Sequence, residues 1–547
     1  MTKSHNFFDS KLALGIVSGL LLGFSFPPFH FGWLAFVALI PFLLAIDSAT
    51  SYKEILKLSY FTFLIFNIIV IYWVGGWSKE TDPFMMIGGA ALVAGHPLFF
   101  VIPILFYRFL RKRLGRTSLL LFPFLYLSFE HIHSITQVAF PWLTVGYSQC
   151  YNLPGIQFAS LTGLFGVSLQ ILLVNSLLAY AVMLWLDGPG ENKTKLILSV
   201  SAAFLFVVIP ELYGLSVLAK AGRTHFGKEL RVTIIQPDID PYAKWIGSPS
   251  QILRTYEKET YTALGNKADL VVWPETAIPF YILLPPFNNY REELQTFVDT
   301  TGISLMSGLP LAKFYPDSND AKPSSHYDEF MHQYYDAYNG AALFLPHSDR
   351  YQTYGKIILV PFAERLPYAD ALPFLIGPLK WGVGISNWAR GTDTTVFRLA
   401  GGTRFSTVIC YESVFPGFVR EFTKKGADFL VIITNDGWYG DTSGPYQHAA
   451  YAIMRAVENR RSVVRSANTG ISEFIDPYGR YIGVPTKYGE IATITENIPL
   501  NDSVTFYADH GNWIAHLAEI ISAASILIVL FLKLKHPETR RDSNELH

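Results

Sequence analysis

The chain has 547 residues, of which 50% are hydrophobic and 16% are charged, whereas soluble domains carry about 25% charged residues. Its length predicts more than one folding unit, and its mean hydropathy of +0.26 indicates that part of it lies in lipid. The formal net charge is -1 and no long basic run occurs in the polar half, which argues against nucleic-acid binding.

Hydrophobic stretches follow one another through the first 218 residues, and one more closes the chain. Most approach the ~20 residues that a helix needs to cross a bilayer, and the first two are short enough to be tilted or re-entrant. The predicted spans are 12–26, 31–46, 57–75, 84–106, 117–133, 162–186, 196–218 and 513–532. The first lacks a small-residue cleavage site, so we expect it to be uncleaved. The pattern predicts a helical membrane bundle over 1–218 and a final helix with a tail over 506–547.

Lysine and arginine are concentrated in alternate connections between these spans. The richer set is Lys3, Lys11, Lys53, Lys57, Arg108, Arg111, Lys112, Arg113, Arg116, Lys193, Lys195, Lys533, Lys535, Arg540 and Arg541. The other connections contain only Lys79. The positive-inside rule therefore predicts that both termini are cytoplasmic. The polar segment 219–505 would then face the periplasm from a bacterial inner membrane.

Strand-like runs alternate with helical ones between residues 219 and 505, which predicts an α/β domain with largely buried sheets. The predicted helices are 250–264 and 446–460. The predicted strands are 231–236, 269–276, 303–308, 341–345, the run that ends at Cys410, 429–436, 462–467 and 471–476, the last two forming a hairpin.

The chain contains two cysteines, which is no disulfide framework, and nothing resembles metal-ligand spacing, so neither a metal nor an organic cofactor is expected. Cys150 lies among apolar residues, and we interpret it as packing. Cys410 ends a β-branched run that Pro416 prevents from continuing. Most free cysteines are small buried hydrophobes. A thiol at the carboxyl end of a buried strand, however, lies where α/β folds place their chemistry.

Taken singly, the other polar residues have ordinary interpretations. Lys356 alone fits a solvated lysine, and Glu275 fits a loop carboxylate. Arg455 and Glu458, three residues apart on a predicted helix, fit a structural ion pair. His448 fits a structural residue at the start of that helix rather than a base.

Four segments in one order along the chain carry a more specific pattern. They are Val272-Trp273-Pro274-Glu275-Thr276, Tyr354-Gly355-Lys356 with Val360-Pro361-Phe362-Ala363-Glu364, Ile409-Cys410-Tyr411-Glu412, and Thr434-Asn435-Asp436-Gly437-Trp438-Tyr439-Gly440. The pattern resembles the carbon–nitrogen hydrolase (nitrilase) superfamily, and the membrane spans narrow the resemblance to the apolipoprotein N-acyltransferase family. Ala363 departs from the glycine that is common there. The resemblance implies an αββα sandwich over 219–505.

The resemblance also implies a Glu–Lys–Cys triad of Glu275, Lys356 and Cys410. A nearby ammonium promotes ionisation of a thiol and stabilises an oxyanion, and a carboxylate can accept the thiol proton. The supporting residues implied are Glu364, Tyr411 and Glu412, and the substrate-binding residues are Trp245, on a mobile arm near the entrance, and Asn339.

The family's activity implies a ping-pong acyl transfer through a Cys410 thioester. The donor would be a membrane phospholipid, phosphatidylethanolamine in this family, and the acceptor the α-amino group of a diacylated apolipoprotein; we expect a monomer. One alternative is a membrane-tethered amidase or nitrilase that uses water as the second nucleophile. Another is a scaffold that binds lipoproteins without chemistry. The eight predicted spans count against the amidase, since one span suffices for tethering, and the intact triad counts against the scaffold.

Overall fold

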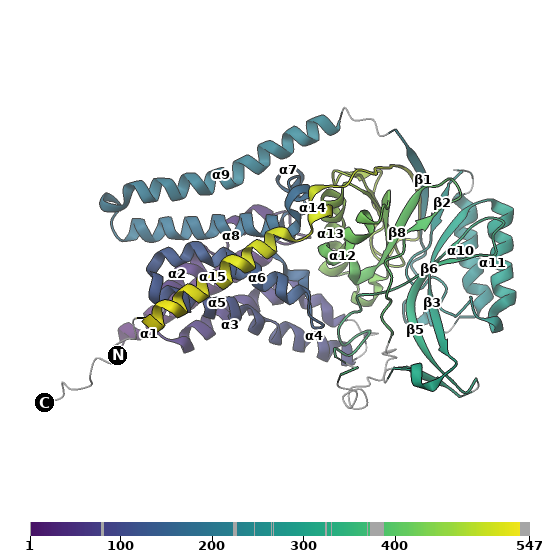
Figure 1. Cartoon of the computed structure of the whole chain (residues 1–547), viewed down its shortest axis with the longest axis horizontal. Helices are drawn as coiled ribbons and strands as arrows, with labels where there is room; N and C mark the ends of the chain where they lie inside the picture. Colours follow the sequence, from purple (N-terminus) through teal and green to yellow (C-terminus); the bar gives the residue numbers. More distant parts are fainter. Residues whose placement is uncertain are drawn as a thin grey trace.

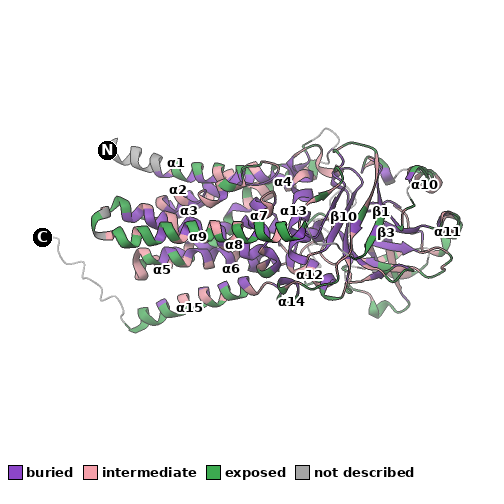
Figure 2. Ribbon diagram, turned by 90° about the horizontal axis from the view of Figure 1, so that it is seen from above, coloured by how far each residue is buried: buried purple, intermediate pink, exposed green. Residues whose placement is uncertain are grey.

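The computed structural model describes residues 2–77, 81, 83–222, 227–245, 247–263, 265, 267–322, 325–329, 331–368, 370–371 and 388–535, without the side chains of 2–10, Pro189, Glu191 and Trp245. Lys3, Lys79, Arg540 and Arg541 of the predicted charge pattern thus fall outside the described side chains. Figure 1 shows two parts placed end to end, a bundle of helices and a sandwich of sheets and helices. The start of α1 (Thr2–Phe24) and the end of α15 (Trp513–Lys535) lie at the bundle end farthest from the sheets (Figures 1 and 2).

The bundle contains long apolar helices with shorter pieces between them. Its other elements are η1 (Gly32–Phe36), α2 (Ile40–Asp47), α3 (Tyr52–Ile71), η2 (Tyr72–Gly75), α4 (Pro83–Gly95), α5 (Pro97–Leu114), η3 (Gly115–Leu121), α6 (Phe122–Ser134), η4 (Pro141–Leu143), η5 (Val145–Gln149), α7 (Leu153–Ile156), α8 (Ala159–Leu186) and α9 (Pro189–Ala221). Five helical stretches among the described residues are long and apolar enough to cross a membrane. The membrane bundle is confirmed, and the number of spans stays a prediction.

The structure divides several of the predicted spans into shorter elements, including 117–133, which is split between η3 and α6. The stretch 84–106 is divided between α4 and α5, which meet at His96. Pro97 begins α5, where its missing N–H costs nothing, whereas a proline inside a continuous helix would remove a hydrogen bond. The stretch 31–46 is likewise divided, into η1 and α2. Mean hydropathy alone did not reveal either division, because both halves of each stretch are apolar.

Apolar side chains cover the outside of the bundle. In Figure 2, α9 and α15 are exposed along much of their length, and only 11% and 17% of their most apolar windows are buried within the protein. Leu198, Phe204 and Leu212 are each more than half exposed. A contiguous apolar surface of this kind is unfavourable in water but suits contact with hydrocarbon.

Ion pairs gather at the bundle end that is remote from the sheets. Lys11 Nζ lies 2.8 Å from Glu54 Oε1, and Arg111 Nε lies 2.6 Å from Asp47 Oδ1. Arg116 pairs with Asp47 and also with Asp187, at the end of α8. The basic connections predicted from the sequence therefore meet at one end of the bundle.

The carboxyl-terminal half forms two sheets covered on both outer faces by helices, the predicted αββα order (Figure 1). One sheet has the order β13-β1-β2-β3-β5-β4 with β6 paired to β5, and the other has the order β12-β11-β10-β9-β8-β7. The first sheet contains β1 (Glu229–Gln236), β2 (Leu270–Val272), β3 (Ser304–Tyr315), β4 (His326–Asp328), β5 (Gln333–Phe344), β6 (Gln352–Gly355) and β13 (Ala492–Pro499). The second contains β7 (Phe397–Arg398), β8 (Arg404–Ile409), β9 (Phe429–Thr434), β10 (Ser462–Ala467), β11 (Glu473–Ile475) and β12 (Tyr481–Ile482).

The covering helices explain why the central strands are apolar throughout. The first sheet packs against α10 (Pro249–Ala263) and α11 (Asn288–Thr301), and the second against α12 (Pro416–Lys424) and α13 (Ser443–Asn459). All six residues of β9 are buried, because one face meets the other sheet and the opposite face meets helices. The predicted α10, α13 and β10–β11 hairpin are confirmed. The sequence analysis did not predict α11, α12 or the edge strand β13. The strands it predicted at 303–308 and 341–345 are shorter than β3 and β5.

The bundle packs against the α12–α13 side of the sandwich. Gln447 of α13 accepts hydrogen bonds at Oε1 from the indole nitrogens of Trp142 (2.7 Å) and Trp73 (3.0 Å). Tyr147 donates a 2.7 Å hydrogen bond to the carbonyl of Val414. The carboxyl ends of β8 and β9 are thereby held next to the bundle.

Candidate active site

Cys410 lies directly after β8 and begins the short helix η11 (Cys410–Val414). Its φ of 51° is in the left-handed region, which is costly for a residue with a side chain. The surrounding bonds hold this turn: Ser413 Oγ donates to the Cys410 carbonyl at 2.8 Å. The turn projects a partly buried thiol from the sheet edge, where the sequence predicted the nucleophile.

Lys356 follows β6 and is almost completely buried, with a 1% exposed fraction. Its Nζ lies 2.8 Å from Glu364 Oε1 and 3.8 Å from Glu275 Oε1. Burial alone would lower the pKa of Lys356, but the Glu364 and Glu275 carboxylates and the nearby Cys410 raise it above its ordinary value. The ammonium therefore keeps its charge although it is buried away from water.

Glu275 follows β2, and its carboxylate is oriented by Asn339 from β5. Asn339 Nδ2 donates to Glu275 Oε1 at 2.7 Å and to Glu364 Oε1 at 3.1 Å. Burial raises the pKa of Glu275, against the lowering effect of Lys356. The structure thus brings together the predicted residues Glu275, Lys356, Glu364 and Asn339. The Asn339 amide links the two carboxylates.

The Cys410 thiol is electrostatically coupled to this group. Burial raises its pKa, Glu275 raises it further, and Lys356 lowers it. A thiolate that is buried away from water and has no nearby cation is unfavourable, so burial favours the protonated thiol. Ionisation then requires a nearby group that accepts the proton. Glu275 is such an acceptor, and Lys356 can stabilise the thiolate that results.

Glu412 holds the Cys410 turn through hydrogen bonds to the backbone. Its carboxylate accepts hydrogen bonds from the backbone nitrogens of Ile409 (2.8 Å) and Ile357 (2.7 Å) and from Tyr354 Oη (2.7 Å). Burial raises its pKa to about 7, opposed by these hydrogen bonds. Glu412 therefore ties the Cys410 turn to the backbone that follows Lys356.

Tyr411 and Trp245 lie apart from the group formed by Glu275, Lys356 and Asn339. The Tyr411 hydroxyl donates to the carbonyl of Ala139 at 2.8 Å, which links the turn to the bundle. Trp245 ends the short helix η6 (Ala243–Trp245), and its side chain lies outside the described residues. Its predicted contact with substrate stays a prediction.

Lys244, beside Trp245, was missed as a site residue by sequence reasoning. Its Nζ donates to the backbone carbonyl of Glu275 at 3.0 Å and to Asn468 Oδ1 at 3.3 Å. Burial lowers its pKa to about 7, against the raising effect of Glu275. Its only sequence signal was its position directly before Trp245, because burial of a lysine cannot be recognised from local pattern.

A second polar network was also missed. A ring nitrogen of His448, a carboxylate oxygen of Asp436 and Cys410 Sγ all lie within 4.8 Å of one another, a grouping that could hold a metal ion. Asp436 is already paired with Arg465 at 2.6 Å and with His448 at 2.8 Å. These two partners hold its pKa at about 2 although burial opposes the charge. A buried guanidinium on the same carboxylate disfavours a cation there.

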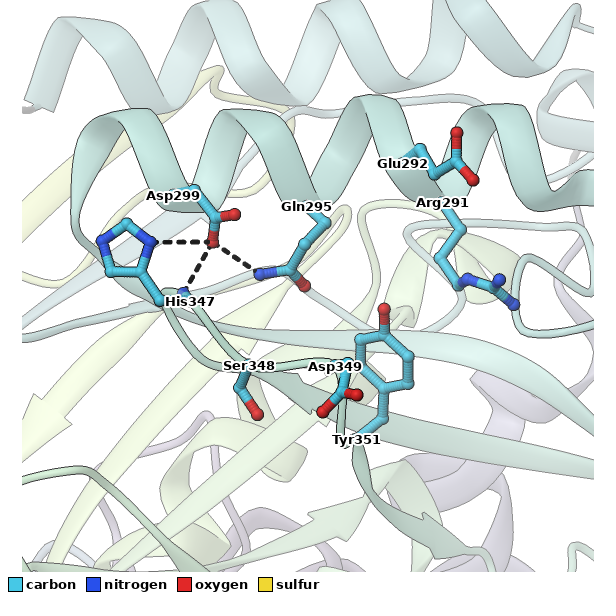
Figure 3. A pocket seen from close by; sticks show the side chains of 8 residues that line it. All are labelled: Arg291, Glu292, Gln295, Asp299, His347, Ser348, Asp349 and Tyr351. Carbon is cyan, nitrogen blue, oxygen red and sulfur yellow. Dashed lines mark hydrogen bonds and ion pairs between the residues drawn. The ribbon is translucent and has the colours of Figure 1, made fainter.

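Two other polar features lie away from Cys410. His131, His516 and Glu519 form a group in the bundle whose Glu519 carboxylate already contacts both rings, at 2.8 and 3.1 Å. A hollow of ≈ 380 Å³ lies beside α11, and Asp299 at its edge accepts hydrogen bonds from Gln295 and from the backbone of His347 (Figure 3). The polar groups in both places bond to one another, and neither contains a predicted site residue.

The buried Arg455 and Glu458 approach to 3.0 Å on α13, as the predicted ion pair requires. Glu458 also accepts a 2.6 Å hydrogen bond from the backbone nitrogen of Leu164 in α8. This pair lies at the contact between the sandwich and the bundle and reinforces it.

Family models match both parts of the chain. Residues 18–177 match the apolipoprotein N-acyltransferase N-terminal domain, and residues 231–506 match carbon–nitrogen hydrolase. Together with the paired sheets and covering helices, these matches define a membrane-integrated protein of the carbon–nitrogen hydrolase class.

Full-length relatives narrow this class. The apolipoprotein N-acyltransferase of Chlorobaculum tepidum is 34% identical over 533 residues, covering 95% of this chain and 96% of the relative. That of Geobacter metallireducens is 29% identical, with 95% of each chain covered. The chain belongs to the apolipoprotein N-acyltransferase family. Among solved structures, an amidase from Nesterenkonia sp. is similar over 53% of this chain and 95% of its own, at 18% identity and a TM-score of 0.36.

Proposed function

We propose that the chain transfers an acyl group from a membrane phospholipid to the α-amino group of the amino-terminal S-diacylglyceryl-cysteine of an apolipoprotein, through a thioester on Cys410. One arrangement carries this proposal. The buried ammonium of Lys356 lies between the Glu275 and Glu364 carboxylates, near Cys410, whose backbone is strained. The family membership and the lipid-suited surface of the bundle support it.

In the first half-reaction, Glu275 accepts the thiol proton and Cys410 Sγ attacks the ester carbonyl carbon of the donor. Lys356 stabilises the tetrahedral oxyanion. The ester C–O bond then breaks, Glu275 returns the proton to the departing alkoxide, and a lysophospholipid leaves an acyl thioester on Cys410.

In the second half-reaction, the α-amino group of the acceptor attacks the thioester carbonyl and gives a proton to Glu275. The C–S bond breaks, the thiolate takes that proton back, and the amide product forms. Both substrates carry acyl chains, which leave hydrocarbon at a cost of ~0.8 kcal/mol per CH₂. A thiol held next to a membrane bundle therefore removes the need to extract either substrate fully.

The proposed sidedness follows from charge. The basic connections lie at the bundle end opposite the sandwich, so the positive-inside rule orients the sandwich outward, toward the periplasm of a bacterial inner membrane. In a background without native cysteines, Asp320→Cys should react with a membrane-impermeant maleimide in intact cells. Lys193→Cys should react only after permeabilisation, and the reverse pattern would invert the proposed orientation.

The chemical test is mass spectrometry of the purified enzyme after incubation with phosphatidylethanolamine. We expect an acyl adduct on Cys410 that is released by an amino-terminal diacylated peptide. Cys150→Ala is the matched control and should keep the adduct, while Cys410→Ala should lose it. An adduct in the Cys410→Ala variant would refute the assignment, and release by water alone at the same rate would favour an amidase.

A further inference from the structure

Lys244 belongs to the segment that joins β1 to α10, and Asn468 anchors the start of this segment. The backbone nitrogen of Asp238 donates to the carbonyl of Asn468 at 2.9 Å. Asn468 Nδ2 donates in turn to the carbonyl of Ile239 at 2.6 Å. The side chain of Lys244 reaches back to the same asparagine, so both ends of the segment that carries Trp245 are fastened at one place.

The geometry around Lys244 Nζ assigns its hydrogen bonds. Asn468 Nδ2 faces the Ile239 carbonyl, which can only accept, so Asn468 Oδ1 is the atom turned toward the lysine. Lys244 Nζ donates to Asn468 Oδ1 at 3.3 Å and to the backbone carbonyl of Glu275 at 3.0 Å. The amino group donates whether it is neutral or charged, so neither contact depends on the protonation state of Lys244.

The burial of Lys244 makes these two contacts important. The residue is only 3% exposed, although lysine is among the residues that are least often buried. Taking its head group out of water is unfavourable unless protein acceptors replace the lost water. One of the two acceptors belongs to Glu275, the residue that carries the candidate base.

The turn that contains Glu275 has a strained backbone. Thr276, the next residue, has a φ of 49°, in the left-handed region that is costly for a β-branched residue. β3 packs closely against this turn at Gly308, where an added Cβ would lie 2.8 Å from the Glu275 Cα. Because the Glu275 side chain leaves from this backbone, a shift of the turn would displace its carboxylate from Lys356 and Asn339.

The geometry points to Lys244 as a positioning residue for Glu275: its amino group holds the carbonyl of the base residue and ties the strained turn to Asn468. This inference rests on the proposed function in that it takes Glu275 as the acceptor of the Cys410 proton. Lys244 acts through the backbone of Glu275 and not on the reacting atoms. It keeps the carboxylate where it can accept the thiol proton, and proton transfer is sensitive to such placement.

The test compares Lys244→Met with the unaltered residue, both in full-length protein carrying Cys150→Ala. Methionine keeps most of the side-chain volume but has no donor. We expect the maximal rate of Cys410 acylation by phosphatidylethanolamine to fall by ~10²-fold, while the half-saturating phospholipid concentration changes by less than about twofold. Alkylation of Cys410 by iodoacetamide at neutral pH should also slow, because it too requires loss of the thiol proton. Lys258→Met, at an exposed lysine of α10, is the matched control and should leave both rates unchanged.

Two outcomes in folded Lys244→Met would overturn the inference. A purely structural role predicts lower thermal stability with both rates unchanged. A higher half-saturating phospholipid concentration with an unchanged maximal rate would instead assign Lys244 to substrate binding through the neighbouring Trp245.

If Lys244→Met does not fold, Lys244→Gln provides the second test. Its amide keeps a donor in the buried place, but the side chain is shorter and cannot hold the Glu275 carbonyl as the lysine does at 3.0 Å. The same slowing of acylation and alkylation is expected, and unchanged rates would overturn the inference.

A failure of the proposed function would appear separately, because alkylation requires no acyl transfer. If protein with Lys244 intact forms no acyl adduct, the proposed acyl transfer is refuted. Slower alkylation of Cys410 in Lys244→Met would still support the role of Lys244 in placing the base.

Discussion

Two sets of ion pairs lie in opposite surroundings, those of Arg111 and Arg116 in the bundle and those of Lys356 and Asp436 in the sandwich. At the remote end of the bundle, the Arg111 and Arg116 side chains are 21% and 38% exposed. In the sandwich, the side chains of Lys356, Asp436 and Arg465 are all at most 2% exposed. An exposed pair is solvated in both folded and unfolded states, whereas a dry pair exists only because the fold supplies every partner. The difference predicts how much each replacement costs.

The largest effect on activity is expected at Lys356, whose buried charge is proposed to stabilise the oxyanion of the reaction. Lys356→Met keeps the side-chain volume but removes the cation, and formation of the acyl-enzyme should slow by ~10³-fold. The measurement is the rate of acylation by mass spectrometry at saturating phospholipid. Lys356→Arg is the companion variant and should recover little activity, because a planar guanidinium cannot reproduce a point charge between Glu275 and Glu364. A rate within tenfold of the unchanged enzyme in Lys356→Met would remove this lysine from the mechanism.

A smaller effect is expected at the contact between the two parts. Gln447→Leu leaves the Trp142 indole N–H without its 2.7 Å acceptor in a buried place, so the free energy of unfolding should fall by ~1–3 kcal/mol. Thermal unfolding in detergent micelles measures it. Tyr451→Phe removes a 2.9 Å donation to the Trp142 carbonyl and should cost ~1 kcal/mol. Equal stability of all three proteins would show that this contact contributes little.

Glu412 should make stability depend on pH. Its folded-state pKa of about 7 lies above the ordinary value of 4.5, so the folded state favours the protonated carboxyl. Its stabilising contribution is complete below pH ~4.5 and is lost as pH rises through ~7, with a slope of at most ~1.4 kcal/mol per pH unit. Glu412→Gln does not titrate and should flatten the unfolding free energy across this window, even though its amide replaces an acceptor and lowers stability throughout. An identical slope in both proteins would contradict the raised pKa.

The smallest effect is expected at the exposed end of the bundle. Arg116→Ala removes its pairs with Asp47 and Asp187, but Arg111 still contacts Asp47. The unfolding free energy should change by ~0–1 kcal/mol, less at high salt, and acylation of Cys410 should be unaffected. A loss as large as that of Gln447→Leu would show that exposure is a poor guide to cost in this molecule.

Local pattern in the sequence determined the apolar stretches of the bundle, the strand that ends at Cys410 and the helix that carries His448, whereas it extended the strand before Glu275 to Thr276 although β2 ends at Val272. These features depend on the period and the length of hydrophobic runs, which neighbouring residues specify. The basic connections likewise predicted one shared end for residues from distant helices. Where a proline divided an apolar stretch, as at Pro97, the same pattern was misleading.

Only the tertiary structure decided which polar groups share a site. Asn339 bridges Glu275 and Glu364, Lys244 holds the carbonyl of Glu275, and the Asp436–His448 pair lies behind Cys410. Residues this far apart in the chain meet because parallel neighbouring strands end at one edge of a sheet and the two sheets stack face to face. The same packing excludes water. Without water, lysine, histidine and carboxylate side chains interact more strongly and shift one another's pKa. No local run of residues specifies this exclusion of water, because it depends on which distant segments pack over each side chain.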